Sequence, residues 1–227
     1  MPTILITGAG RGLGLEFARQ YAAEGWAVIA TLRDPAKGAA LTELGRSVEV
    51  HMLDVTDHPA IQRLARELKG RPLDLLLNNA GIYGPRTQGL GEIDYAAWEK
   101  VLATNVMGPL AMSEALADNI AASGRKLVVM VSSQMGSIGD NTSGDDYIYR
   151  SSKAALNAVT KSLSIDLGRR GIVVVAVHPG WVRTDMGGTG ASLAPKTSIA
   201  QLRALFAKLG PKDSGKFFNY DGTKRAW

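Results

Sequence analysis

Short apolar runs alternate with longer amphipathic stretches along the whole chain. Several of these runs are apolar on both faces, which is typical of strands in a parallel sheet that is covered on each side. The runs lie at residues 3–7, 26–32, 48–53, 73–78, 126–132 and 172–177. Helical patterns fill the intervals at residues 13–24, 57–70, 94–122 and 149–169, and a shorter one follows at 198–209.

This alternation predicts an α/β fold, a single-domain doubly wound (Rossmann-type) parallel sheet of about seven strands with helices on both faces. Residues 216–220 would form the seventh strand, at an edge of the sheet. The chain contains no repeat and no linker, so we expect one domain over residues 1–227. Two long loops with several glycines, 133–148 and 178–197, follow predicted strands. Because ligands of such sheets bind at the carboxyl ends of the strands, we expect the site beside these loops.

Composition narrows the classes of partner. The formal net charge of +5 comes from scattered Lys and Arg, so we expect no nucleic-acid binding, although a faintly basic surface suits an anionic small molecule. The absence of cysteine excludes disulfides and thiolate metal sites and fits a reducing compartment. His51, His58 and His178 lack metal-ligand spacing, so we expect no metal and structural histidines. No apolar run approaches the ~20 residues of a membrane span, and the first residues enter a strand directly, so we expect a cytoplasmic protein without a membrane partner.

A cluster of glycines lies between the first predicted strand and the first predicted helix. Gly8, Gly12 and Gly14 form a G-x-x-x-G-x-G pattern there. Glycines at this turn let backbone N–H groups approach a pyrophosphate, and the N-terminus of the following helix favours its charge. A tight turn that only packs closely needs a single glycine, so three at this spacing predict a dinucleotide site.

The end of the second strand indicates which dinucleotide. Asp34 falls ~20 residues beyond the glycines, where a carboxylate on a ribose hydroxyl would favour NAD. However, Asp34 precedes Pro35, and Asp-Pro is typical of a helix N-cap followed by proline at the first helical position. Arg33 is then better placed to face the ribose, and Arg11 lies inside the glycine loop. Since guanidinium groups pair bidentately with phosphate, we predict NADP (NADPH).

Tyr149 and Lys153 lie four positions apart where a loop gives way to a helix, so their side chains share one face. Such a pair is ordinarily part of a solvated helix surface. The other interpretation is an acid and the group that tunes it. A free phenol has a pKa of about 10, and a nearby ammonium favours the phenolate and lowers that pKa toward the range useful for general acid catalysis.

Seven segments, in order, resemble motifs of the short-chain dehydrogenase/reductase family. They are TGAGRGLG (7–14), LDV (53–55), NNAG (78–81), TNVMG (104–108), VSSQMG (131–136), YRSSK (149–153) and HPGWVRTDM (178–186). Within the family, the chain is most similar to the C-factor-like, or sniffer-type, carbonyl reductases. Those proteins are NADPH-linked, which agrees with the interpretation of Arg11 and Arg33.

The resemblance implies a set of cofactor-binding residues. Asp54 would bond the adenine amino group, Lys153 the nicotinamide ribose, Val182 the carboxamide through its backbone, and Thr184 the carboxamide or a phosphate. The full predicted set is Gly8, Arg11, Gly12, Leu13, Gly14, Arg33, Asp54, Val55, Asn79, Ala80, Gly81, Tyr149, Lys153, Pro179, Gly180, Val182 and Thr184.

The resemblance also implies a catalytic set of Asn105, Ser133, Tyr149 and Lys153. Tyr149 would protonate the substrate carbonyl oxygen, and Lys153 would tune that proton. We predict Ser133 rather than Ser132 as the serine that donates a hydrogen bond to the developing oxyanion, because Gly136 lies three residues after it. Ser133 precedes Tyr149 by 16 residues, a few more than in many family members, so the loop between them must absorb the excess. Asn105 would hold a water that gives Lys153 a proton path.

These residues predict an NADPH-dependent oxidoreductase that reduces a ketone or aldehyde to an alcohol, with a small-molecule carbonyl or alcohol as its partner. The alternative is a cofactor-binding signalling protein of the C-factor type, in which the fold acts as a sensor with little or no turnover. Family members commonly pair through their fourth and fifth helices, so we expect a homodimer or homotetramer.

Overall fold

A computed structural model describes all residues, 1–227, and contains one seven-stranded sheet in which every pair of neighbouring strands is parallel. The strand order is β3-β2-β1-β4-β5-β6-β7, so the chain reverses its direction of progress next to β1. All seven predicted strands are confirmed, including the edge strand. Their bounds are β1 Thr3–Ile6, β2 Ala27–Leu32, β3 Val48–Met52, β4 Leu75–Asn78, β5 Leu127–Val131, β6 Val173–His178 and β7 Phe217–Asn219.

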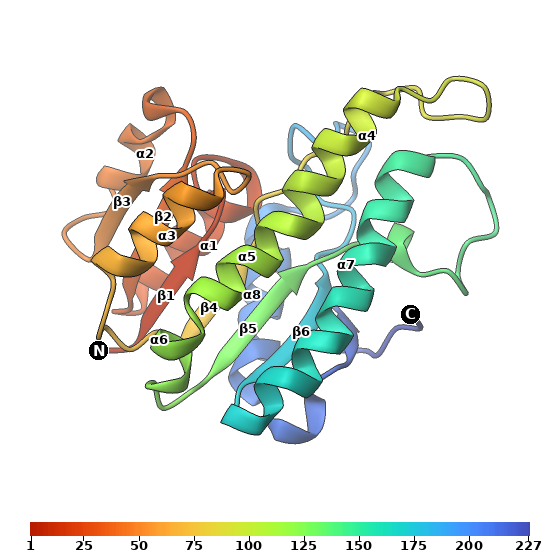
Figure 1. Ribbon diagram of the computed structural model, residues 1–227. Helices are drawn as coiled ribbons and strands as arrows, with labels where there is room; N and C mark the ends of the chain where they lie inside the picture. The colour runs from red at the N-terminus through yellow and green to blue at the C-terminus, as the bar shows by residue number, and fades with distance from the viewer.

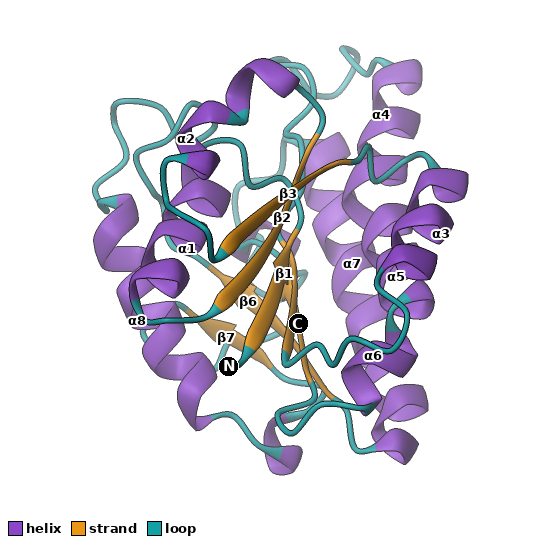
Figure 2. Ribbon diagram, turned by 90° about the vertical axis from the view of Figure 1, so that its left-hand side faces the viewer, coloured by secondary structure: helices purple, strands orange, loops and turns teal.

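Helices cover both faces of the sheet (Figure 2). On one face lie α1 (Gly12–Ala23), the short α2 (Ala39–Thr42) and α8 (Pro195–Lys208). On the other lie α3 (His58–Glu67), α4 (Tyr95–Leu102), α5 (Gly108–Ala115), α6 (Ala117–Ala121) and α7 (Tyr147–Asp166). The predicted single-domain, doubly wound α/β class is therefore confirmed.

The apolar runs of the strands are explained by two cores. Ile4 and Ile6 of β1 face the cluster that contains Phe17 of α1 and Phe206 of α8. Leu5, between them, faces the opposite cluster, which contains residues of α3, α5 and α7. Successive side chains of a strand point to opposite faces, so a strand covered on both sides must be apolar at every position.

The predicted helix over 94–122 is wrong as one continuous element. Figure 1 shows α4 and α5 following one another along α7, but residues Ala103–Met107 between them form a π-helical turn, and α6 is separate. The widened turn ends at Gly108, where a Cβ would lie 2.9 Å from both Cγ2 and the carbonyl oxygen of Val55. Insertions of this kind are frequent at functional sites, and this one contains Asn105.

The helix that carries the Tyr149–Lys153 pair begins earlier than predicted, at Tyr147 instead of 149. Asp145 and Asp146, just before it, have φ values of 59° and 50°, in the left-handed region that L residues other than Asn and Asp rarely adopt. Tyr149 therefore lies in the first turn of α7, held by the helix from its first residues onward.

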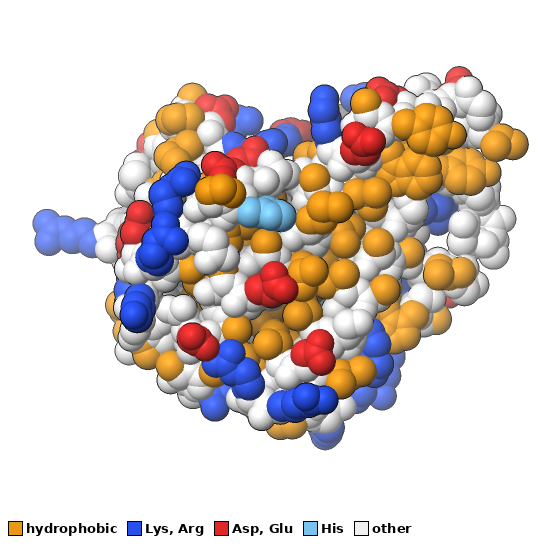
Figure 3. Space-filling model, viewed as in Figure 1, with side chains coloured by type: hydrophobic (Ala, Val, Ile, Leu, Met, Phe, Trp, Pro, Cys, Tyr) orange, Lys and Arg blue, Asp and Glu red, His pale blue; other side chains and the backbone are white.

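The face made by α4, α5 and α7 carries many hydrophobic side chains at the surface (Figure 3). Tyr95, Met107 and Ile165 on this side are more than half exposed. The predicted homodimer or homotetramer would use this face, and that oligomeric state stays a prediction. None of the helices combines the length and the apolar character that crossing a membrane requires.

The fit of α5 against Val55, in the segment after β3, can be tested with Gly108→Ala. The added Cβ meets a backbone oxygen that cannot move aside easily, so we expect the free energy of unfolding to fall by about 1–3 kcal/mol in urea denaturation. Gly168→Ala is the matched control, because nothing lies within 4 Å of the Cβ built there. It should leave the stability unchanged or raise it by up to about 1 kcal/mol. Equal effects of the two substitutions would contradict the packing described.

Candidate active site

A cleft opens at the carboxyl ends of the strands, where the predicted loops emerge. Figure 3 shows the upper edge of the molecule dipping between the parts that carry α2 and α4, with basic side chains beside the dip. Fifteen of the predicted site residues line this cleft. They are Gly8, Arg11, Gly12, Leu13, Gly14, Arg33, Asp54, Val55, Asn79, Ala80, Gly81, Tyr149, Lys153, Pro179 and Thr184.

Two glycines of the loop at one side of the cleft, Gly8 and Gly14, have no room for a side chain. Gly8 has a φ of 67°, and a Cβ on it would lie 3.0 Å from Cα of Ala80. A Cβ on Gly14 would collide with the carbonyl of Gly8 and lie 2.7 Å from Nδ2 of Asn79, which donates to the Thr7 and Gly8 carbonyls. The loop thus packs its backbone against the end of β4 and presents it at the cleft, which fits a pyrophosphate at the start of α1.

Basic side chains gather where the glycine loop and the end of β2 meet the cleft. Arg11 pairs with Asp185 of the loop after β6, and Arg33 lies 3.5 Å from Oδ2 of Asp54. Asp34 caps the following short helix by accepting from the backbone N–H of Ala36, as its position before proline predicted, although it also borders the cleft. All these charges are largely exposed, so their pairs are weak and can rearrange around an anion.

Sequence reasoning missed Lys37, a third cation on the cleft wall. Its position follows from the turn capped by Asp34, three residues earlier, to which its amine is paired at 3.7 Å. The pattern of an N-cap, a proline and a lysine in the first turn was the available signal.

At the other end of the cleft, Tyr149 and Lys153 are buried, with exposed fractions of 7% and 5%. The solvated-pair interpretation is therefore wrong for these two side chains. The Lys153 amine lies 5.7 Å from the centre of the Tyr149 ring and donates to the Val131 carbonyl at 2.8 Å. Both side chains line the cleft, so their polar ends border the space where a ligand would lie.

The expected lowering of the Tyr149 pKa is wrong for the protein by itself. Burial raises the pKa of the Tyr149 phenol to about 12, and a hydrogen bond with the Ser133 side chain opposes part of that increase. Burial also lowers the pKa of the Lys153 amine, from 10.5 to about 8. The apolar surroundings disfavour both charged forms, and this desolvation outweighs any attraction between ammonium and phenolate.

The two adjacent serines after β5 have different partners. Ser132 borders the cleft, but its hydroxyl donates to Oδ1 of Asn157 at 2.7 Å, which makes it a structural group. The Ser133 hydroxyl accepts from the backbone N–H of Met135 at 3.2 Å and lies close enough to the Tyr149 phenol to lower its pKa, although Ser133 itself does not line the cleft. The catalytic role of Ser133 stays a prediction.

Asn105 lies fully buried behind the cleft instead of on its wall. Its amide nitrogen donates to the Ile82 carbonyl and the Ser152 hydroxyl, and its oxygen accepts from the Ile82 backbone N–H. A Cβ built on Gly81 would lie 3.3 Å from that oxygen and 3.6 Å from the Lys153 amine. Asn105 and the amine therefore both lie next to Gly81, and Asn105 fixes the segment after β4.

The segment after β6 brings only part of its predicted set to the cleft. Pro179 and Thr184 line it, whereas Gly180 and Val182 do not. Val182 is buried and bridges to Leu193, but the two hydrogen bonds of that bridge come from the Trp181 carbonyl and the Arg183 N–H, so the Val182 backbone groups are not used in it and their contact with a carboxamide stays a prediction. His178, expected to be structural, is buried too, and burial and the charge of Arg225 lower its pKa to about 4.

Two residues that were not predicted from the sequence, Tyr83 and Gln88, contact Tyr149 directly. The Tyr83 ring lies 4.6 Å from the Tyr149 ring, centre to centre, and its hydroxyl donates to Asp146. Gln88 is buried and its side-chain oxygen accepts from the Tyr149 backbone N–H at 2.9 Å, which satisfies a free donor of the first turn of α7. Both come from the loop after β4, where no local pattern distinguishes them from ordinary loop residues.

Comparison with known proteins agrees with this geometry. The sequence matches the short chain dehydrogenase family over residues 2–192. The C-signal protein of Myxococcus xanthus is 42% identical over 156 residues, which are 69% of this chain and 93% of that protein. Carbonyl reductase Sniffer of D. melanogaster is 36% identical with a TM-score of 0.91, and the match covers 100% of both chains. The NADPH-bound carbonyl reductase from chicken fatty liver is 35% identical with a TM-score of 0.90, over 100% of this chain and 99% of that one.

The chain therefore belongs to the short-chain dehydrogenase/reductase family of oxidoreductases. The resemblance seen in its motifs, including the similarity to C-factor-like and sniffer-type proteins, is confirmed.

The burial of Lys153 has a consequence for stability that a Lys153→Met variant can isolate. Between pH 8 and 10.5 the folded amine is deprotonated while the unfolded one still carries its proton, so the unfolded state binds more protons. Stability conferred by the wild-type residue must then rise with pH. Without cofactor, we expect the difference in free energy of unfolding, wild type minus variant, to increase by roughly 1–2 kcal/mol between pH 7.5 and 9.5. A difference that is flat or falls over this range would contradict a desolvated amine.

Proposed function

We propose that this protein is an NADPH-dependent reductase that converts a ketone or aldehyde to an alcohol, with Tyr149 as the general acid. The observation that carries the proposal is that one cleft contains three kinds of group. It contains the open glycine backbone, the cations Arg11 and Arg33, and the buried pair Tyr149 and Lys153. The charged end suits a phosphorylated adenosine and the buried end suits proton transfer.

The cleft residues would hold NADPH along its length. The backbone of the glycine loop would bind the pyrophosphate, and Arg33 and Arg11 would bind the 2′-phosphate. The two arginines would give up their present carboxylate partners for this phosphate, which carries more negative charge. Lys37 adds a third cation at the same end. Asp54 and Val55 would border the adenine, and Lys153 would bond the ribose hydroxyls next to the nicotinamide. The reduced nicotinamide, when bound, supplies the hydride for the carbonyl carbon.

Tyr149 would give its phenolic proton to the carbonyl oxygen as the C–O π electrons move onto that oxygen. A phenol whose pKa is about 12 keeps its proton at neutral pH, so Tyr149 would be protonated before the reaction. An alkoxide is a stronger base than a phenolate, so the transfer is favourable even without a lowered pKa. The nearby Lys153 ammonium would stabilise the phenolate that remains, and this matters more after the transfer than before it.

Ser133 and Asn105 would support the same proton transfer from two sides. The Ser133 side chain lies beside the Tyr149 phenol and lowers its pKa, and its hydroxyl would donate to the developing oxyanion from a preorganised position. Asn105 would hold a water behind Lys153, through which the phenolate regains its proton.

The second candidate is a signalling protein that binds the cofactor with little turnover. It is favoured by the 42% identity to C-signal. A sensor of this kind has no need of a buried acid with its own hydrogen-bonded serine, so we rank the reductase first. Tight NADPH binding without oxidation by any ketone, aldehyde or quinone of a broad panel would favour the sensor.

The role of Tyr149 can be tested with Tyr149→Phe against Tyr147→Phe. Loss of the acid should lower kcat for NADPH-linked carbonyl reduction by on the order of 10²–10⁴-fold, with the Kd for NADPH changed less than threefold. Tyr147, two positions earlier on the same helix and 43% exposed, has no lysine four residues later, so its variant should retain wild-type kcat. Residual kcat of Tyr149→Phe within about tenfold of wild type would remove Tyr149 from the role.

Cofactor choice can be tested with Arg33→Ala against Arg63→Ala. Loss of a charge-assisted contact to the 2′-phosphate should lower kcat/KM for NADPH by roughly 10–100-fold and leave that for NADH within threefold. Arg63 is a matched control, because it is paired to an aspartate and 58% exposed, compared with 60% for Arg33. An unchanged ratio of the two cofactors in Arg33→Ala would contradict the assignment.

A further inference from the structure

The chain after β7 folds back on the edge of the sheet and forms a brace, which we define as residues 220–227. Asn219 donates its backbone N–H to the Thr223 carbonyl, and Arg225 donates its own to the Phe217 carbonyl, so the segment pairs antiparallel with β7. The Trp227 ring stacks on Phe217, with ring centres 5.7 Å apart. The brace is therefore ordered by the sheet edge and does not depend on the site.

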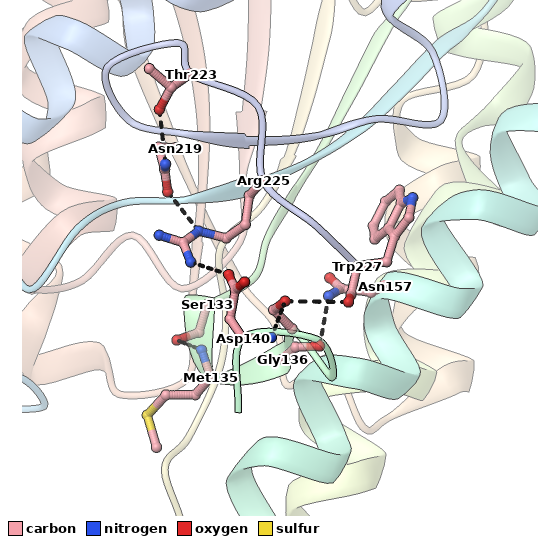
Figure 4. Close-up of polar contacts among 10 residues, drawn as sticks. Ser133, Met135, Gly136, Asp140, Asn157, Asn219, Thr223, Arg225 and Trp227 are labelled. Carbon is pink, nitrogen blue, oxygen red and sulfur yellow. Dashed lines mark hydrogen bonds and ion pairs between the residues drawn. The ribbon is translucent and has the colours of Figure 1, made fainter. Parts of the chain in front are cut away.

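The brace holds the turn that follows β5. The Trp227 carbonyl accepts from the Ile138 backbone N–H at 3.1 Å and from the Ser137 hydroxyl at 3.2 Å. Figure 1 shows the C-terminus close to the loop between β5 and α7, although the two are far apart in the sequence. Figure 4 shows the Arg225 guanidinium between Asn219, at the end of β7, and Asp140, in the loop after β5. Its Nε donates to Asn219 at 2.8 Å and its terminal nitrogen to Asp140 at 2.6 Å.

The same turn is held on its other side by α7. Asn157 donates to the Gly136 carbonyl at 3.1 Å (Figure 4). It also accepts from Ser132, the residue before Ser133. A Cβ on Gly136 would lie 2.7 Å from the backbone of Lys153. The turn from Ser133 to Asp140 is thus clamped between α7, which carries the acid, and the brace.

We propose that Arg225 is a positioning residue that acts through Asp140 to hold this turn, and with it the Ser133 hydroxyl, against Tyr149. The proposal rests on the proposed reductase function. Arg225 itself does not line the cleft, and its side chain is only 19% exposed, so its ion pair is shielded more than the pairs of Arg11 and Arg33. None of residues 133–140 lines the cleft, and the turn acts on Tyr149 through Ser133, so Arg225 would affect turnover of the carbonyl without affecting cofactor affinity.

Arg225→Met and Asp140→Asn test this separation. Each should lower kcat/KM for the carbonyl substrate by on the order of 5–20-fold, because a small misplacement of a hydrogen-bond donor is costly in the transition state. The Kd for NADPH should stay within twofold. The double variant should be no worse than either single one, because both remove the same contact. Arg170→Met is the control: Arg170 forms a pair of the same length, 2.6 Å, with Asp118, away from the cleft, and its loss should leave kcat/KM unchanged.

A second readout does not need turnover. Backbone amides of residues 136–140 should exchange hydrogen faster in Arg225→Met and in Asp140→Asn than in wild type, while those of the glycine loop stay unchanged. If Arg225→Met does not fold, Asp140→Asn tests the same contact from the exposed loop. Additive losses in the double variant, wild-type kcat/KM in both single variants, or unchanged exchange would each overturn the positioning role. Absence of turnover in wild type, with the exchange result as expected, would refute the reductase function and leave the clamp standing.

Discussion

The close contact between α7 and the turn after β5 is the constraint on which the site depends. Gly136 leaves no space between that turn and the backbone of Lys153. This proximity lets the Lys153 amine reach the Val131 carbonyl at the end of β5, and it brings Ser133 to Tyr149. The same contact excludes water from the acid and the amine, which is why their pKa values move in opposite directions. A side chain at position 136 would separate all of these groups at once.

The two ends of the cleft use charge in different ways. At the end of the cleft with the glycine loop, the cations are exposed and held loosely by carboxylates, so an anion can displace those carboxylates at little cost. At the other end, Tyr149 and Lys153 are buried with few polar partners, so small displacements change their proton affinities strongly. Recognition of the cofactor can therefore vary through surface substitutions, whereas the chemistry depends on the packing of α7, the turn and the brace.

Much of this could be predicted from the sequence, because strands covered on both faces and a glycine loop at a strand–helix junction leave strong local patterns. All seven strands were predicted, and fifteen predicted site residues line one cleft. The π turn at Ala103–Met107 was missed, since its wider turn changes the apolar periodicity too little to be detected over five residues. Gln88, Asn157 and Arg225 were missed because each acts across a long sequence separation that no local pattern records. The pKa of Tyr149 was misjudged because the degree of burial is not visible from an i, i+4 spacing.

The most direct test of the central claim is a crystal structure of the protein with NADP⁺ and a carbonyl-containing inhibitor. We predict that the inhibitor oxygen accepts hydrogen bonds from both Tyr149 and Ser133, beside the nicotinamide ring, and that Arg33 contacts the 2′-phosphate. A nicotinamide placed outside the cleft, or an inhibitor oxygen out of hydrogen-bond reach of the Tyr149 hydroxyl, would contradict it.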